Sequence, residues 1–211
     1  MDKYEITFQT WDKVALSYQD KFMDLDLYND SYDLFCSLVK KPDPKIFEIG
    51  CGPGNITRYI LSKRPDFKIR GIDVSQNMIK LAKENNPAAE FELMDCRKVD
   101  GLTSEFDAVI CGFCMPYLSK EDCEKLIKDC SFLLIKGGIL YFSTIEDDYH
   151  KSGYETNSSG EHQVYVYYHE AEYLKKYLEE NAFEIKSVSR KSYQKTETVL
   201  STHLIFVAKK I

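Results

Sequence analysis

No part of this sequence restricts the fold as strongly as IFEIGCGPGN, residues 46–55. A short apolar run, typical of a buried strand, opens directly into a turn that contains three glycines. The residues after the turn, 56–62, favour a helix. A strand, a glycine turn and a helix in this order form the first unit of a parallel α/β sheet. The glycines of such a turn also let the backbone approach a nucleotide closely.

The same alternation continues along the chain. We predict strands over residues 45–49, 67–73, 89–94, 106–111, 139–144, 183–193 and 198–208. We predict helices over residues 56–62, 76–84, 120–134 and 170–180, with Ser75 as an N-cap, Gly137-Gly138 as a helix end and Asn181 as a C-cap. This order indicates an α/β fold with a seven-stranded, mostly parallel sheet and helices on both faces. The last two strands have no helix between them and should form an antiparallel C-terminal hairpin at one edge.

The first part of the chain has a different character. Residues 1–42 should be helical, because aromatic residues are interleaved there with charged ones, and Asp43-Pro44 then breaks the pattern. Residues 43–211 form the α/β core, which contains a polar loop over 146–168. At 211 residues, the chain is most economically a single domain.

Composition narrows the function classes. The net charge of −6 argues against a nucleic-acid partner, because phosphate contacts require a basic face. The first residues lack a signal-peptide pattern, and no stretch approaches the ~20 apolar residues of a membrane span. Seven irregularly spaced cysteines favour a reducing compartment. We therefore expect a cytoplasmic monomer or homodimer without a membrane anchor.

The glycine turn does not suit a diphosphate. Dinucleotide-binding turns have the spacing G-x-G-x-x-G, whereas this turn reads G-x-G-x-G with Pro53 inside it. Proline has no N–H to donate to a phosphate, and Glu48 just before the turn would repel one. The turn therefore favours a nucleoside without phosphates, with a positively charged part.

Five segments in order, FEIGCGPGN, GIDVSQNM, MDCRKV, FDAVICGFCMPYL and VYYHEAEYLKKYLEENAFEI, resemble the class I S-adenosylmethionine-dependent methyltransferases, specifically the small-molecule branch. The resemblance covers essentially the whole chain. It implies a Rossmann-like fold, S-adenosylmethionine (SAM) as cofactor, S-adenosylhomocysteine (SAH) as product and a small-molecule substrate (EC 2.1.1.-). It also implies that residues 1–42 are a lid and that the 146–168 loop lies on the substrate side.

The resemblance carries cofactor-binding roles onto a set of residues. They are Tyr18, Glu48, Gly50, Cys51, Gly52, Gly54, Asp73, Val74, Met78, Asp95, Cys96, Cys111 and Gly112. Asp73 would accept from the ribose hydroxyls and Asp95 from the adenine amino group. Met78, helped by Val74, would pack on the adenine, and Tyr18 would cover the cofactor from the lid. An alternative interpretation makes Asp73 only a helix cap and Asp95 only a turn residue.

Cys111 and Cys114 form a C-x-x-C pair that invites a redox or zinc interpretation. The helix begins too late for Cys111 to lie at its N-terminus, and Cys123 and Cys130 share an apolar helix face. We expect no metal. The resemblance instead makes this stretch a wall between cofactor and substrate.

Methyl transfer needs a general base only if the nucleophile arrives protonated, so the catalytic residue stays open. His150 and His162 are the candidates, because histidine titrates near neutrality, although both could be plain loop histidines. A non-catalytic cofactor-binding protein is one alternative. An NAD(P)-dependent reductase is another, but its Tyr-x-x-x-Lys pattern occurs only as Tyr59…Lys63, directly after the glycine turn.

Overall fold

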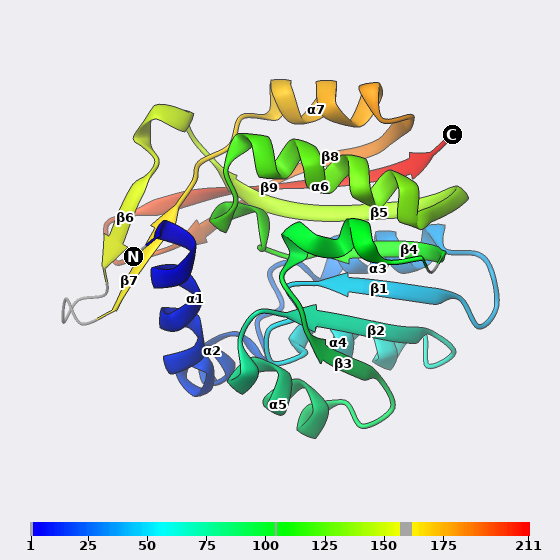
Figure 1. Ribbon diagram of the computed structural model, residues 1–211, viewed down its shortest axis with the longest axis horizontal. Coiled ribbons are helices and arrows are strands. Elements are labelled where there is room, and N and C mark those ends of the chain that lie inside the picture. The colour runs from blue at the N-terminus through cyan, green and yellow to red at the C-terminus, as the bar shows by residue number, and fades with distance from the viewer. Residues whose placement is uncertain (1, 104, 157–161) are drawn as a thin grey trace.

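A seven-stranded sheet with the order β3-β2-β1-β4-β5-β9-β8 forms the centre of the protein (Figure 1). The computed structural model describes residues 2–103, 105–156 and 162–211. The strands are β1 (Lys45–Ile49), β2 (Lys68–Asp73), β3 (Glu90–Leu93), β4 (Phe106–Cys111), β5 (Leu134–Glu146), β8 (Phe183–Gln194) and β9 (Leu200–Lys210). Strands β1 to β5 pair in parallel, and β9 runs antiparallel to both β5 and β8. The predicted mostly parallel sheet and its C-terminal hairpin are confirmed.

The strand order reverses between β1 and β4. The chain moves outward from β1 through β2 to β3 and then returns to place β4 on the other side of β1. In open α/β sheets, ligands bind at this switch point, beyond the carboxyl ends of the strands. The fold therefore brings the turn after β1 next to the residues that follow β4.

Helices cover both faces of the sheet. They are α3 (Asn29–Leu38), α4 (Asn55–Lys63), α5 (Gln76–Asn85), α6 (Lys120–Leu133) and α7 (Ala171–Glu180), with short 3-10 helices η1 (Cys96–Gly101), η2 (Met115–Tyr117) and η3 (Tyr149–Lys151). In β1, Phe47 and Ile49 pack in the cluster of α6 and α7, whereas Ile46 packs with α3 and α4. Figure 1 shows α6 in front of the sheet and α3 and α4 behind it. Burial on both faces explains why Ile46, Phe47 and Ile49 are apolar, and it makes Glu48 a buried polar exception in this strand.

Two local expectations differ from the structure. Helix α6 ends at Leu133, and β5 begins at Leu134, so Gly137 and Gly138 lie inside the strand instead of ending the helix. The pairing of β4 with β5 shifts register at this point, where Gly137 adopts a φ of 82°. The two glycines therefore mark an irregularity in a strand, which is a known alternative to a helix end.

The 146–168 segment, expected to be a polar loop, has secondary structure of its own. It contains η3 and an antiparallel hairpin of β6 (Gly153–Thr156) and β7 (Gln163–Val166). Residues 157–161 of this segment lie outside the described part of the chain. The hairpin provides a surface on which the N-terminal helices can dock.

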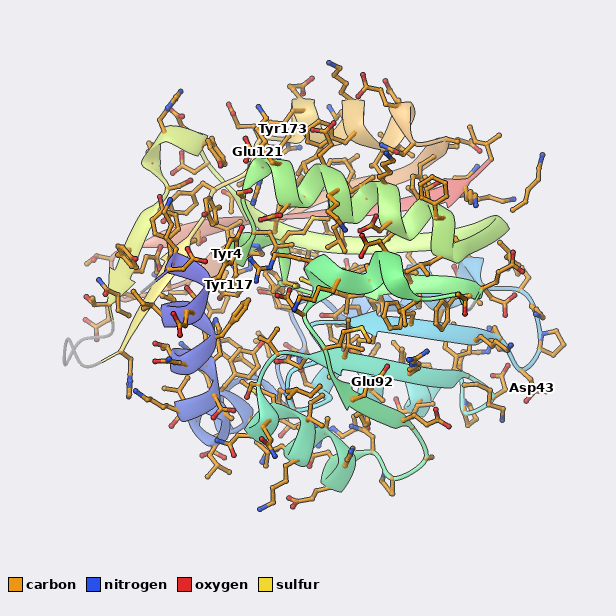
Figure 2. All side chains as sticks on the ribbon, in the orientation of Figure 1. Tyr4, Asp43, Glu92, Tyr117, Glu121 and Tyr173 are labelled. Atoms are coloured by element: carbon orange, nitrogen blue, oxygen red, sulfur yellow. The ribbon has the colours of Figure 1, made fainter. Side chains whose placement is uncertain are left out.

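Helices α1 (Lys3–Lys13) and α2 (Ala15–Phe22) stand beside the carboxyl ends of β1 and β2 (Figure 1). Thr10 Oγ1 donates to the carbonyl of Gln163 at 2.7 Å, which ties α1 to β7. Figure 2 labels two further points where α1 meets the core. The Tyr4 hydroxyl donates to Asp122 at the start of α6, and Trp11 packs against Tyr117 with ring centroids 5.3 Å apart. The N-terminal helices therefore cover the switch point of the sheet.

The part of the chain that the structure describes has no helix with both the length and the apolar character needed to cross a bilayer.

Candidate functional site

A cavity lies at the switch point, beneath the N-terminal helices. It spans about 730 Å³, including the part open to solvent. Many of the expected cofactor residues line it: Tyr18, Gly50, Gly52, Asp73, Val74, Met78, Cys96 and Gly112. We call this space the first cavity. Residues from five separate segments of the chain therefore meet in one place.

Gly52 presents bare backbone to the first cavity. Its φ is 53°, and a Cβ built on it would have its nearest described neighbour, Tyr18 Cε1, at 3.7 Å. The described residues therefore leave room beside the Gly52 backbone. A backbone conformation that disfavours side chains, next to open space, suits close approach of a ligand to the main chain.

Gly54 has a different role, although it belongs to the same turn. It is the N-cap of α4 with a φ of 81°, and a Cβ there would lie 2.3 Å from Asn86 Nδ2. That amide donates to the carbonyl of Gly54 at 3.0 Å. Gly54 does not line the first cavity, and its lack of a side chain allows α4 and α5 to pack.

Asp73 is the fixed carboxylate of the first cavity. It ends β2, and its two oxygens accept from the backbone N–H groups of Gly52 and Ser75, each at 2.9 Å. Burial raises the pKa of Asp73, although these backbone donors oppose the shift. Because each carboxylate oxygen has a second lone pair, the group can still accept from ligand hydroxyls. The expected N-cap of the next helix is Ser75, whose hydroxyl accepts from Met78 N at 3.0 Å.

Glu48 lies under the glycine turn and is completely buried. The Thr57 hydroxyl donates to its Oε2, whereas Oε1 has no hydrogen-bond partner among the described residues. Burial raises the pKa of Glu48 to about 8, and Asp73 adds to this shift. One oxygen of this buried carboxyl, under the glycine turn, has no described partner. A positive charge nearby would therefore favour the ionised form of Glu48.

Asp95 does not line the first cavity. It caps η1 by accepting from the backbone of Arg97, and the Arg97 guanidinium binds the same carboxylate at 2.6 Å. Burial favours the neutral acid, but the Arg97 hydrogen bonds outweigh it, so the pKa of Asp95 is lowered. Its neighbour Cys96 does line the cavity, 3.6 Å from the thiol of Cys114.

Two expected cysteines are also set back from the first cavity. Cys51 packs with Ile79, Ala82 and Phe91, and Cys111 belongs to the main core. The described residues contain no group of three or more side chains that could hold a metal ion. In α6, Cys123 and Cys130 are buried, so the cysteines act here as small apolar residues.

Further lining residues had not been assigned from the sequence. They are Phe8, Trp11, Met94, Phe113, Cys114, Tyr117 and Leu118. Phe8 and Trp11 precede Tyr18 in the N-terminal helices, at a spacing that places aromatics on one helix face. From the sequence alone, that spacing could have indicated that these aromatic side chains share one face. Among the residues after Cys111, Phe113 and Tyr117 line both this cavity and a second one, so a wall between cofactor and substrate stays a prediction.

This second cavity adjoins the first and encloses about 1030 Å³, including its open part. Both cavities are lined by Trp11, Tyr18, Gly50, Gly112, Phe113 and Tyr117. The remaining walls of the second cavity come from α2 through the start of α3, the start of α4, the end of β5, the β6–β7 hairpin, and the ends of β8 and β9. The β6–β7 hairpin belongs to the 146–168 segment, so part of that segment does reach the site.

The histidine that lines the second cavity is His203, on β9. Its Nδ1 lies 2.7 Å from the Tyr28 hydroxyl, and burial lowers its pKa to about 4. The sequence candidates lie elsewhere among the described residues: His150 is exposed in η3, and His162, before β7, lines neither cavity. His203 follows a strand pattern that looks purely structural, so no local signal distinguished it.

Comparisons with known proteins agree with this geometry. Residues 46–138 match the family described as Methyltransferase domain. A mitochondrial ubiquinone biosynthesis O-methyltransferase of Saccharomyces cerevisiae is 28% identical over 147 residues, 67% of this chain and 46% of that protein. A trans-aconitate 2-methyltransferase of Sinorhizobium medicae is 38% identical over 63 residues, 30% of this chain and 24% of that protein. The matched regions span less than half of these curated relatives.

Solved structures extend the likeness across the chain. The N-methyltransferase NodS from Bradyrhizobium japonicum, in complex with SAH, has a TM-score of 0.73 at 18% identity. The match covers 97% of this chain and 98% of that one. Residues 46–138 are therefore similar to a methyltransferase domain, and the whole chain shares its fold with SAM-dependent methyltransferases, the family that its motifs resemble.

Proposed function

We propose that this protein transfers a methyl group from SAM to a small-molecule acceptor and releases SAH. The observation that carries the proposal is the pairing of Asp73 with the bare backbone of Gly52 in a cavity at the switch point. A fixed carboxylate beside an open backbone suits a nucleoside whose ribose hydroxyls are free.

The residues present fit SAM better than a phosphorylated cofactor. Glu48 Oε1 and Trp11 Nε1 are buried without partners among the described residues, and Pro53 supplies no N–H. Two carboxyl groups near the turn, Glu48 and Asp73, disfavour phosphates and favour the ammonium and sulfonium of SAM. Asp73 would hold the ribose, Met78 and Val74 would pack on the adenine, and the glycine backbone would face the methionine part.

When bound, SAM supplies a methyl carbon that an acceptor lone pair attacks in line, while the carbon–sulfur electron pair returns to sulfur and gives SAH. The chain's own residues then provide position and shielding. Tyr18, Trp11 and Tyr117 line both cavities, so their rings would separate the reaction zone from water. Holding the two partners in reacting geometry can account for about 7–11 kcal/mol of the barrier.

Calorimetry with SAH and NADH tests this function directly. We expect SAH to bind and NADH not to bind. NADH binding without SAH binding would contradict the proposal and favour the reductase alternative. A panel of acceptors with SAM, followed by SAH release, then separates a methyltransferase from a non-catalytic cofactor-binding protein, which would release none.

We further propose that residues 1–211 act as one domain, with the N-terminal helices as lid, in the cytoplasm. All seven cysteines are free thiols, which supports a reducing compartment. The net charge of −6 supports a small-molecule partner over a nucleic acid.

Glu48 should make SAM binding depend on pH. Its pKa of about 8 leaves it mostly neutral at pH 7, and the positive charges of SAM favour its ionised form. Binding at pH 7 should therefore release a proton, and affinity should rise as the pH increases toward 8. Calorimetry in two buffers with different ionisation enthalpies measures the proton count.

Glu48→Gln is the control, because it cannot titrate; it should release no proton and lose this pH dependence. Identical heats in both buffers for the unchanged protein would contradict the prediction.

The same pKa implies a stability effect in the free protein. Because the folded state holds the proton more tightly than the unfolded state, stability should fall as the pH rises from about 4.5 to about 8.

A further inference from the structure

The second cavity is bordered by aromatic rings that touch one another in sequence. On the lid side, Tyr117 packs on Trp11 at 5.3 Å and Trp11 on Tyr18 at 5.5 Å between centroids. Tyr18 then packs on Phe22 at 4.5 Å. These contacts form a continuous aromatic wall along α1 and α2.

A second run of aromatic rings lines the same cavity, from β8, β9, the segment after β4 and the N-cap of α3, and it meets the first run where Tyr193 contacts Phe22 at 6.4 Å. Tyr193 stacks on His203 at 4.9 Å with an interplanar angle of 16°, and His203 contacts Phe113 at 4.7 Å. Phe113 packs on Tyr28 at 4.9 Å. Two runs of aromatic rings along one cavity favour a flat ligand, since aromatic groups stack with an energy gain beyond simple burial.

The charges around the second cavity cancel. Among its described lining residues, the only side chains charged at pH 7 are Glu155 and Lys195, which form an ion pair at 2.5 Å. His203 is neutral there, because burial lowers its pKa to about 4. A charged ligand would lose its hydration without gaining a free counter-ion, so the cavity favours an uncharged one.

His203 leaves one ring nitrogen for a ligand. Burial raises the pKa of Tyr28, so its hydroxyl keeps its proton, and its one described partner is His203 Nδ1. Because Nδ1 is the one described partner of this hydroxyl, the arrangement that pairs the Tyr28 proton has Tyr28 donating to Nδ1 and leaves the ring proton on Nε2. Nε2 has no hydrogen-bond partner among the described residues, whereas the other buried histidine, His169, uses both nitrogens. His203 thus offers an N–H donor.

We propose that the second cavity binds a flat, uncharged aromatic acceptor, and that His203 orients this molecule by donating Nε2–H to one of its oxygen or nitrogen atoms. The inference rests on the proposed function, because it assigns the cavity to the methyl acceptor. Tyr28 acts through His203 as a positioning residue, since it fixes which ring nitrogen carries the proton.

Four related probes test the ligand class by calorimetry with SAH present at saturation. They are methyl 4-hydroxybenzoate, its free acid as the anion, 4-hydroxybenzylamine as the cation, and methyl 4-hydroxycyclohexanecarboxylate as the non-planar analogue. We expect the flat ester to bind at least about tenfold more tightly than each of the others. Equal affinities, or a preference for an ion or for the saturated ester, would overturn the ligand class.

Variants test the role of His203. His203→Phe keeps a ring but removes the donor, and should weaken ester binding about fivefold to tenfold. His203→Gln, which keeps a donor, should recover most of that loss. Tyr28→Phe should weaken the ester about twofold to threefold, because the ring proton is then shared between both nitrogens, whereas the surface change Tyr59→Phe should have no effect.

The SAH affinity of each variant reports separately on folding and on the proposed function. Unchanged ester binding in His203→Phe with normal SAH binding would overturn the role of His203. If His203→Phe does not fold, the Gln and Tyr28→Phe variants decide the question in the same way. The probe series is also repeated without SAH. A failure of SAH to bind would then count against the proposed function, while the ligand preference of the second cavity would still be measured.

Discussion

Asp73→Ala protein is expected to bind SAH about 100-fold to 10,000-fold more weakly than the unchanged chain. The carboxylate would accept from two ribose hydroxyls, and hydrogen bonds to a charged group contribute about 1.5–3 kcal/mol each. Asp73 also receives the backbone N–H groups of Gly52 and Ser75 at 2.9 Å, so its removal loosens the turn that faces the ligand. Calorimetry of SAH binding measures the loss.

Asp73→Asn tests the charge with little change of shape. Its amide can present only one oxygen, so one of the two backbone donors must then face an NH₂ group, and binding should again fall by at least about tenfold. The matched control is Asp33→Asn on the surface of α3, where the carboxylate is half exposed. Normal SAH affinity in both Asp73 variants would mean that the carboxylate does not hold the cofactor.

The central part of the fold was predictable from the sequence because its signals are local. β1 has apolar residues on both faces, with Glu48 as the exception, and the glycine turn and Ser75 have fixed meanings within a few residues. The parallel order then follows from alternation alone. Asp73 could be located because it ends a strand, and strand ends of a parallel sheet meet at one edge.

The rest depended on contacts between distant segments. Gly137 and Gly138 look like a helix end, and only the pairing of β5 with β4 makes them part of a strand. His203 lies in an apolar strand and meets Tyr28, the N-cap of α3, 175 residues away, which no local pattern encodes. For Asp95 the motif predicts a ligand contact that stays a prediction, and the structure adds that Arg97, two residues later, binds its carboxylate outside the first cavity.

Gly52→Val protein is expected to show no measurable SAH binding while still folding. The valine side chain would fill the space between the turn and Tyr18, where even a Cβ comes within 3.7 Å of the ring. The φ of 53° adds strain of about 1–3 kcal/mol, which should lower the unfolding free energy by a similar amount. Calorimetry gives the affinity, and denaturant unfolding gives the stability.

Gly54→Ala separates the two effects, because it has the same kind of backbone strain at a site outside the first cavity. Its φ is 81° and its Cβ would press on Asn86 Nδ2 at 2.3 Å, so its stability should fall at least as much as that of Gly52→Val. Its folded fraction should nevertheless bind SAH normally. If both variants lost binding in proportion to their stability, strain in the turn would explain the loss. Binding lost in Gly52→Val alone would instead mean that the ligand needs the open space beside that backbone.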